Sequence, residues 1–210
     1  MVGRILETDT CVAEGADWLC ARDPRFAKAL ALVGAIPLQP RAGGFETLFD
    51  AIIGQQVSVA SADAIWRRLT NAGLTTDKAV AEATEDGLRA CGLSRQKIRY
   101  GLALARAQLD YDALRAQPTE AVIATLTALP GIGPWTAEIY AMFALGRADV
   151  FAPGDLALQE AARLLFDLPA RPGEKAFRAM AQEWQPWRAV AARLLWAYYR
   201  KSKGRQGVRA

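Results

Sequence analysis

Apolar residues recur at helical spacing along almost the whole chain of 210 residues. Alanine is abundant where a strand would need β-branched residues, and Gly, Pro, Ser, Thr and Asp divide the sequence into segments of single-helix length. The spacing therefore predicts an all-α protein, with helices at about 24–33, 45–53, 58–71, 77–83, 85–90, 94–109, 119–127, 134–145, 155–166, 173–183 and 187–202.

Composition limits the cellular location and the partners that we expect for such a helical chain. A hydrophobic content of 52% is enough to bury a core in one large or two small domains. No run of about 18 apolar residues and no secretory signal is visible, so we expect a cytoplasmic protein without a membrane partner, associated with the nucleoid if the source is bacterial. The net charge of +4 is compatible with nucleic-acid binding without being diagnostic of it.

The chain has no histidine. This absence excludes Ser-His-Asp triads, Cys-His pairs and His-ligated zinc. The cysteines Cys11, Cys20 and Cys91 lack Cys-x-x-Cys spacing and are too few for an all-cysteine zinc or iron–sulfur site. Any catalysis therefore falls to carboxylates.

Residues 129–137 read Leu-Pro-Gly-Ile-Gly-Pro-Trp-Thr-Ala and join two predicted helices. Gly131 and Gly133 allow a turn with positive φ, and Pro134 suits the first position of a helix because that position needs no N–H. Backbone N–H groups at such a turn, together with the helix dipole, can bind a phosphate. An ordinary turn between two helices is the alternative.

The helix predicted at 134–145 is almost entirely apolar, and Glu138 is its one charged residue. Glu138 lies three residues beyond Trp135, which places the two side chains on one face of the helix. We therefore expect Glu138 to line the same cavity as Trp135. The alternative is a charge that reaches solvent from the edge of the helix.

The last predicted helix carries Trp187 and Trp196, nine positions apart. At about 100° per residue they lie on opposite sides of the helix. Val190, Leu194 and their neighbours share the Trp187 side, which predicts that Trp187 packs in the core. Trp196 is then expected to face a second lobe or a cleft.

Asp155 stands in Phe-Ala-Pro-Gly-Asp-Leu, 22 residues beyond Gly133. Its position at the start of a predicted helix favours the ionised carboxylate. An ionised carboxylate can stabilise a positively charged transition state and can orient or deprotonate water. The alternative is a helix N-cap, a common role for aspartate.

These features form an ordered set with residues 45–58 (Phe-Glu-Thr-Leu-Phe-Asp-Ala-Ile-Ile-Gly-Gln-Gln-Val-Ser), 91–97 (Cys-Gly-Leu-Ser-Arg-Gln-Lys) and 184–188 (Trp-Gln-Pro-Trp-Arg). The set resembles the helix-hairpin-helix DNA glycosylases of base-excision repair, and within them DNA-3-methyladenine glycosylase II. The resemblance implies a minimal form without the N-terminal β-rich domain. It also implies an active-site cleft between two helical lobes, one at about 45–145 with the hairpin at 119–145, the other formed by 1–44 plus 146–210.

The resemblance further assigns roles to individual residues. Asp155 is the catalytic residue, and Trp135 and Trp196 form the pocket that holds a cationic base, with Glu138 beside Trp135. Gln56 is the wedge that fills the stack when a nucleotide is flipped out, although relatives can carry leucine there and an ordinary helix-connecting turn is the alternative. The residues that contact DNA are Gln55, Gln56, Ser58, Gly131, Ile132 and Gly133.

Departures from the family narrow the expected chemistry. Relatives of the endonuclease III type carry a lysine nucleophile where this chain has Trp135, so no Schiff base and no strand cleavage are expected. The family places tyrosines where this chain has Ile139 and Leu156, which implies a more open base pocket.

The expected function is that of a monofunctional glycosylase that releases alkylated bases of the 3-methyladenine type. No cofactor is expected to be required, but the main-chain carbonyls of Thr127, Leu129 and Ile132 match positions that hold a structural monovalent cation in relatives. The expected partner is double-stranded DNA with alkylated bases. No obligate protein partner is evident, and a monomer is the simpler expectation. Two alternatives stay open: a helix-hairpin-helix module that binds DNA without chemistry, and a glycosylase or lyase for oxidised or mismatched bases.

Overall fold

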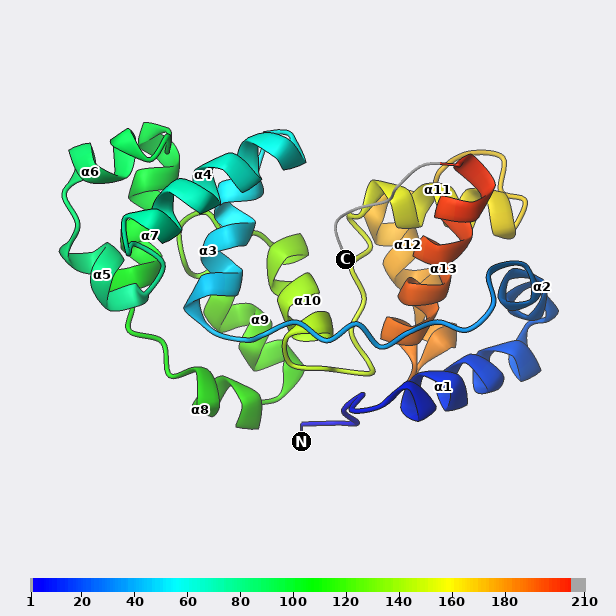
Figure 1. Cartoon of the computed structure of the whole chain (residues 1–210). Coiled ribbons are helices and arrows are strands. Elements are labelled where there is room, and N and C mark those ends of the chain that lie inside the picture. The colour runs from blue at the N-terminus through cyan, green and yellow to red at the C-terminus, as the bar shows by residue number, and fades with distance from the viewer. Residues whose placement is uncertain (1, 205–210) are drawn as a thin grey trace. The chain divides into compact units, whose positions relative to one another are not determined.

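The computed structural model describes residues 2–204, and in this range it is built from helices (Figure 1). An isolated antiparallel bridge between Ile5 and Arg147 is the β pairing found in the described part. No helix in that part is long and apolar enough to span a bilayer. The helices are α1 (Asp9–Arg22), α2 (Pro24–Val33), α3 (Phe45–Gly54), α4 (Val59–Asn71), α5 (Asp77–Glu82), α6 (Glu85–Ala90), α7 (Arg95–Arg106), α8 (Tyr111–Ala116), α9 (Thr119–Thr127), α10 (Pro134–Phe143), α11 (Leu156–Leu165), α12 (Glu174–Met180), the 3₁₀ helix η1 (Ala181–Trp184) and α13 (Arg188–Lys203).

The all-α fold is confirmed, but the sequence reading missed two helices, α1 and α8. In α1 the buried positions are Val12, Gly15, Ala16 and Leu19, which follow helical spacing. Two of the four are small residues, so the apolar face is weak in the sequence. The short helix α8 is started by Asp110, whose carboxylate accepts a hydrogen bond from the N–H of Ala113 at 2.8 Å.

The structure divides into two compact units. The first consists of residues 1–40 and 141–210, and the second of residues 41–140. The lobes expected from the sequence had their limits a few residues later, at 44 and 145. The second limit differs because Met142 and Phe143, at the end of α10, contact Arg193 on α13.

In the first unit α13 packs against α1, α2 and α11. Gly15 allows α1 to approach closely, because a Cβ there would lie 2.6 Å from the ring of Trp187. A cluster of aromatic rings fills the rest of the core, with centroids 4.9–6.0 Å apart. Its members are Phe26, Phe151, Phe166, Phe177 and Trp184.

In the second unit α7 is the central helix and contacts α3, α5 and α6. Gly101 of α7 lets the ring of Phe49 on α3 pack directly on its backbone, since a Cβ at Gly101 would lie 2.5 Å from that ring. Short helices follow one another because each begins at a side chain that accepts a hydrogen bond from the first turn. These N-caps are Ser58, Thr76, Thr84, Ser94 and Asp110.

Candidate functional site

Asp155 lies at the N-terminus of α11 and is only 3% exposed. Its Oδ1 accepts a hydrogen bond from the backbone N–H of Leu158 at 2.9 Å, so the carboxylate is the N-cap of the helix. The helix dipole and this N–H both favour negative charge at that position. The alternative that Asp155 is a helix N-cap is therefore confirmed. The cap also holds a buried carboxylate at the start of α11.

Trp196 on α13 contacts the same carboxylate. Its Nε1–H donates to Oδ1 of Asp155 at 3.2 Å, and its ring lies 5.7 Å from that of Phe143. Trp196 was expected to face a second lobe or a cleft because one core was not expected to bury both tryptophans, but both Trp187 and Trp196 are buried. A helix with neighbours on opposite sides can bury both: Trp187 packs on Gly15, whereas Trp196 packs on Phe143 and Asp155.

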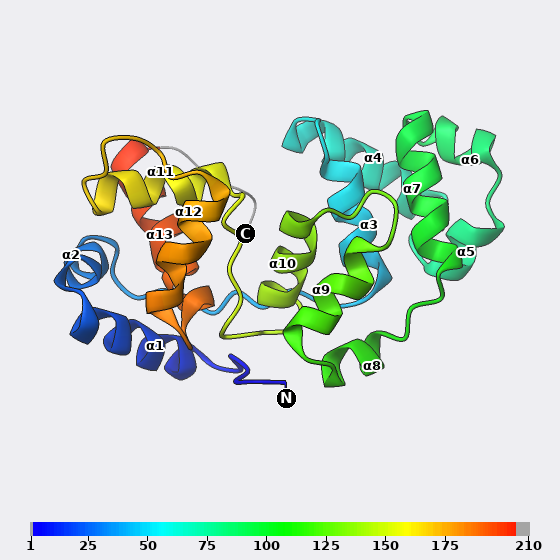
Figure 2. The ribbon, with the colours of Figure 1, turned by 180° about the vertical axis from the view of Figure 1, so that it is seen from behind.

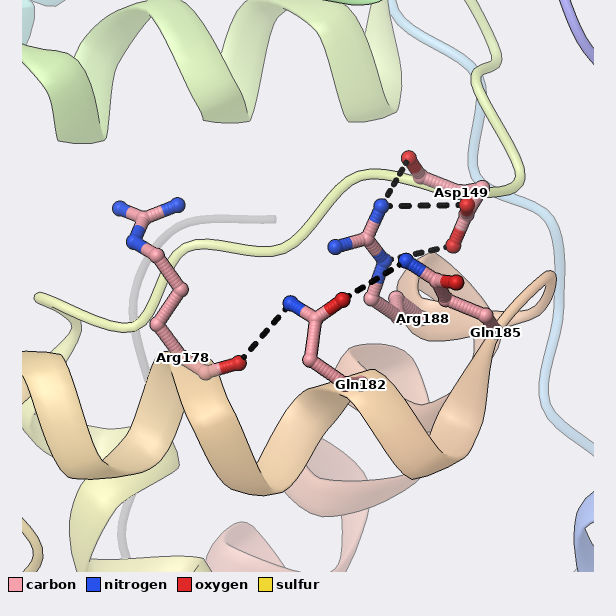
Figure 3. Close-up of polar contacts among 5 residues, drawn as sticks. All are labelled: Asp149, Arg178, Gln182, Gln185 and Arg188. Atoms are coloured by element: carbon pink, nitrogen blue, oxygen red, sulfur yellow. Dashed lines mark hydrogen bonds and ion pairs between the residues drawn. The ribbon is translucent and has the colours of Figure 1, made fainter.

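The motif at 184–188 anchors the start of the helix that carries Trp196. Arg188 donates from Nε to Oδ1 of Asp149 at 2.6 Å and from Nη2 to Oδ2 at 3.1 Å (Figure 3). The N–H of Ala189 donates to the carbonyl of Ala148 at 2.9 Å. Beside this pair, Gln185 donates to Gln182, which in turn donates to the carbonyl of Arg178. The bonds of Arg188 and Ala189 fix the start of α13 to the segment that leads from α10 to Asp155.

The turn between α9 and α10 belongs to the second unit (Figure 2), and of its two glycines only Gly131 takes the positive φ that both would allow. Gly131 has φ of +89°, and the N–H of Ile132 donates to the carbonyl of Leu129 at 3.1 Å. Ile132 is buried and holds the turn to the core, whereas Gly133 is exposed. Pro134 is the first residue of α10. An exposed glycine before a helix N-terminus is suited to close approach by a phosphate.

The turn from α3 to α4 holds the other residues expected to contact DNA. Gln56 is exposed and has φ of +57°, a left-handed conformation that is uncommon for a residue other than glycine. Ser58 is exposed and caps α4, because its Oγ accepts from the N–H of Ser61 at 3.2 Å. Gln55 is half-buried, and its Nε2 donates to the carbonyl of Gly131 at 2.8 Å.

Trp135 and Glu138 occupy different environments on α10. Trp135, in the first turn, is 37% exposed and is one of the exposed large apolar side chains among the described residues. Glu138 is buried at 3% exposure, so the alternative of a charge reaching solvent is wrong. In the first unit Leu156, directly after Asp155, is 64% exposed. An exposed apolar side chain thus stands beside the carboxylate, where the family would place a tyrosine.

The carbonyls proposed to bind a cation belong to the end of α9 and the turn that follows it. The carbonyl of Leu129 accepts the N–H of Ile132, which leaves one of its two lone pairs for another partner. Three main-chain oxygens from one turn are hard, neutral ligands of the kind that a potassium or sodium ion accepts. The chemistry of these three oxygens is thus compatible with such an ion, and the cation site itself stays a prediction.

The sequence analysis did not single out Lys97 and Tyr100, both on α7. The Nζ of the buried Lys97 donates to the carbonyl of Ile53 at 2.6 Å, and burial lowers the pKa of its ammonium group. The ring of Tyr100 packs against Gly131, and a hydrogen bond from Gln96, at 2.7 Å, lowers the pKa of its phenol. The signal for Lys97 was its place on the apolar face of an amphipathic helix.

Comparisons with known proteins agree with this arrangement. The profile of the HhH-GPD superfamily of base excision DNA repair proteins matches residues 49–186. DNA-3-methyladenine glycosylase 1 of Schizosaccharomyces pombe is 30% identical over 161 residues, which cover 72% of this chain and 71% of that protein. The chain spans only 56–58% of the length of three bacterial relatives, from Bacillus subtilis and Escherichia coli.

Two solved structures share the fold. The crystal structure of DNA-3-methyladenine glycosidase from Bacillus halodurans has a TM-score of 0.79 at 31% identity, covering 92% of this chain and 91% of that one. The Schizosaccharomyces pombe 3-methyladenine DNA glycosylase Mag1, in complex with abasic DNA, has a TM-score of 0.78 at 26% identity, covering 93% and 100%. The chain belongs to the HhH-GPD superfamily of base excision DNA repair proteins.

Proposed function

We propose that the protein is a monofunctional DNA glycosylase that flips out alkylated bases of the 3-methyladenine type and releases them by hydrolysis. The observation that carries this proposal is the buried carboxylate of Asp155, held by the N–H groups of Leu158 and Trp196. The relatives named 3-methyladenine glycosylases support the choice of substrate.

The chemistry requires little of the enzyme beyond one negative charge. Alkylation at a purine ring nitrogen leaves the base cationic, so the glycosidic bond breaks with its electron pair leaving on the base, which becomes neutral. Positive charge develops on the deoxyribose, and the carboxylate of Asp155 stabilises it. Water then adds at the sugar carbon C1′ and transfers a proton to that carboxylate.

The remaining residues bind the substrate. The turn at Gly131–Gly133 binds a DNA phosphate through backbone N–H groups, and Gln56 fills the space left by the flipped nucleotide. The exposed ring of Trp135 stacks on the cationic base, an attraction of up to about 2 kcal/mol when desolvated. The buried Trp196 forms the wall of the base pocket next to Asp155, and Glu138, three residues beyond Trp135 on α10, completes the proposed pocket residues.

A monovalent cation held by the carbonyls of Thr127, Leu129 and Ile132 would add positive charge near the bound phosphate. The protein would otherwise act as a monomer on double-stranded DNA, without a cofactor, in the compartment that holds the chromosome. Replacing potassium or sodium by a bulky organic cation at fixed ionic strength should weaken DNA binding. Unchanged affinity would contradict the cation site.

Mass analysis of the bases released from methylated duplex DNA tests the proposed function. We expect free methylated purines and no covalent adduct after borohydride treatment, because Trp135 stands where a lyase would need an amine. DNA binding without release of any base would favour a non-catalytic helix-hairpin-helix module. Borohydride trapping of the protein on DNA would favour the lyase for oxidised or mismatched bases.

A further inference from the structure

The α3–α4 turn and the α9–α10 turn are joined by a side chain. Nε2 of Gln55 donates to the carbonyl of Gly131 at 2.8 Å, and both residues belong to the second unit. The backbone N–H of Gln55 donates to the carbonyl of Ile52 at 3.3 Å, at the end of α3. Gln55 is therefore held at its backbone by α3 and at its amide by the hairpin.

The end of α3 is itself fixed by a buried cation. Nζ of Lys97 donates to the carbonyl of Ile53 at 2.6 Å, and the Lys97 side chain is buried. A positive group at the C-terminus of a helix satisfies a carbonyl that has no partner within the helix and interacts favourably with the helix dipole. Helix α3 therefore presents Gln55 and Gln56 from a rigid base.

The hairpin side of the contact is equally constrained. Gly131 has φ of +89°, and a Cβ there would lie 2.4 Å from two carbon atoms of the Tyr100 ring. The ring thus packs on the glycine, while the Gly131 carbonyl accepts the amide of Gln55. A displacement of the hairpin would therefore be transmitted to Gln55.

Gln56 is the residue that this arrangement positions. It is exposed, and its φ of +57° is a left-handed conformation that is strained for a residue with a side chain. Such a conformation persists only where the surrounding contacts fix it. The contacts next to it in the chain are those of Gln55, with Ile52 on one side and Gly131 on the other.

We propose that Gln55 is a positioning residue that couples the phosphate-binding hairpin to the insertion of Gln56 into the DNA stack. This inference rests on the proposed function. In the sequence analysis Gln55 was expected to contact DNA directly, but its amide is used inside the protein. When the hairpin binds a phosphate, the hydrogen bond from the Gln55 amide holds the turn at Gln56 at a fixed position relative to the hairpin. Gln56 can then enter the DNA stack as the damaged nucleotide leaves it.

The variant Gln55→Met tests the coupling, because methionine keeps the length of the side chain and removes the donor. Single-turnover base release is measured on two substrates, a methylated base in a fully paired duplex and the same base in a bulge, where little unstacking is needed. The ratio of the duplex rate to the bulge rate measures how much the insertion of Gln56 contributes to base release. We expect the ratio to fall about fivefold, the effect of one lost hydrogen bond, with affinity for undamaged duplex unchanged within about twofold.

Two further variants calibrate the ratio. Gln56→Gly, which removes the wedge and relieves the left-handed backbone, should lower the ratio at least as much. Gln182→Ala, in the first unit, is the matched control and should leave it unchanged. If methionine disturbs folding, as judged by the melting temperature, Gln55→Ala replaces it.

The outcomes separate the two proposals. An unchanged ratio in a Gln55 variant that melts like the wild type, or an equal loss of its duplex and bulge rates, would overturn the coupling alone. If the wild-type protein released no base from either substrate, the proposed function itself would be overturned.

Discussion

The carboxylate site of the first unit and the turns of the second unit that are proposed to contact DNA are built in opposite ways. Asp155, Trp196 and Phe143 are buried side chains linked by the hydrogen bond from Trp196 to Asp155 and by the contact between the rings of Trp196 and Phe143. Gln56 and Gly133 are exposed, and their positions are set by backbone conformation. Each unit thus presents a different kind of group, a side-chain charge in one and backbone donors in the other.

The difference follows from the partner that each region is proposed to meet. A charge that stabilises a transition state is more effective in a dry, preorganised site than in water. Groups that bind a phosphate backbone must instead be accessible to the DNA. A main-chain N–H suits this role because the backbone fixes its position and no long side chain has to be ordered. The comparison predicts that variants in the first unit change the rate of base release, whereas variants in the second change DNA affinity or the unstacking step.

The largest expected effect is that of Asp155→Asn. Asparagine keeps the N-cap to Leu158, so α11 should fold normally, while the negative charge is lost. We expect base release to fall by about a thousandfold, or ~4 kcal/mol of transition-state stabilisation, with duplex affinity retained. Single-turnover kinetics and a binding titration measure the two quantities. Undiminished release would remove Asp155 from the mechanism.

Substitutions of the two hairpin glycines form a matched pair, and their expected effects on stability and DNA affinity are intermediate in size. Gly131→Ala places a Cβ 2.4 Å from the Tyr100 ring at a positive φ, so we expect the unfolding free energy to fall by about 3 kcal/mol. A Cβ at Gly133 meets no atom within 4 Å, so Gly133→Ala should fold as the wild type and lose only DNA affinity, through its contact with phosphate. Denaturant titration and duplex binding check the pair. Equal destabilisation by both variants would contradict the distinction.

A smaller effect than those of the Asp155 and Gly131 variants is expected from Trp196→Phe. Phenylalanine keeps an aromatic ring beside Phe143 and removes the Nε1–H that donates to Asp155. We expect the base-release rate to fall about tenfold, or ~1.4 kcal/mol. Trp187→Phe is the control, because it truncates a buried tryptophan at the N-cap of α13 and should lower the melting temperature without a specific loss of rate. Equal rates in the two variants would show that the Trp196 bond has no part in the reaction.

Much of the fold followed from local patterns. Caps such as Ser58, Thr84 and Ser94 are visible in the sequence because a single side chain starts a helix by bonding to the turn that follows. Helix α1 was missed because Gly15 and Ala16 are buried against Trp187 and α13, contacts that leave no strong apolar stripe in the sequence. Likewise, the burial of Trp196 could not be predicted from α13 alone, since it depends on Phe143 and Asp155.

The sequence by itself determined the helical class, the turn at Gly131–Gly133 that is proposed to bind a phosphate, and the isolated acid at Asp155, because glycine, proline and N-cap chemistry act over a few residues. The tertiary structure decided which partners those residues meet. Trp196 reaches Asp155 over 41 residues of chain, and Gln55 reaches Gly131 over 76. Such contacts depend on how helices pack, and packing is set by the sum of many side chains rather than by any local motif.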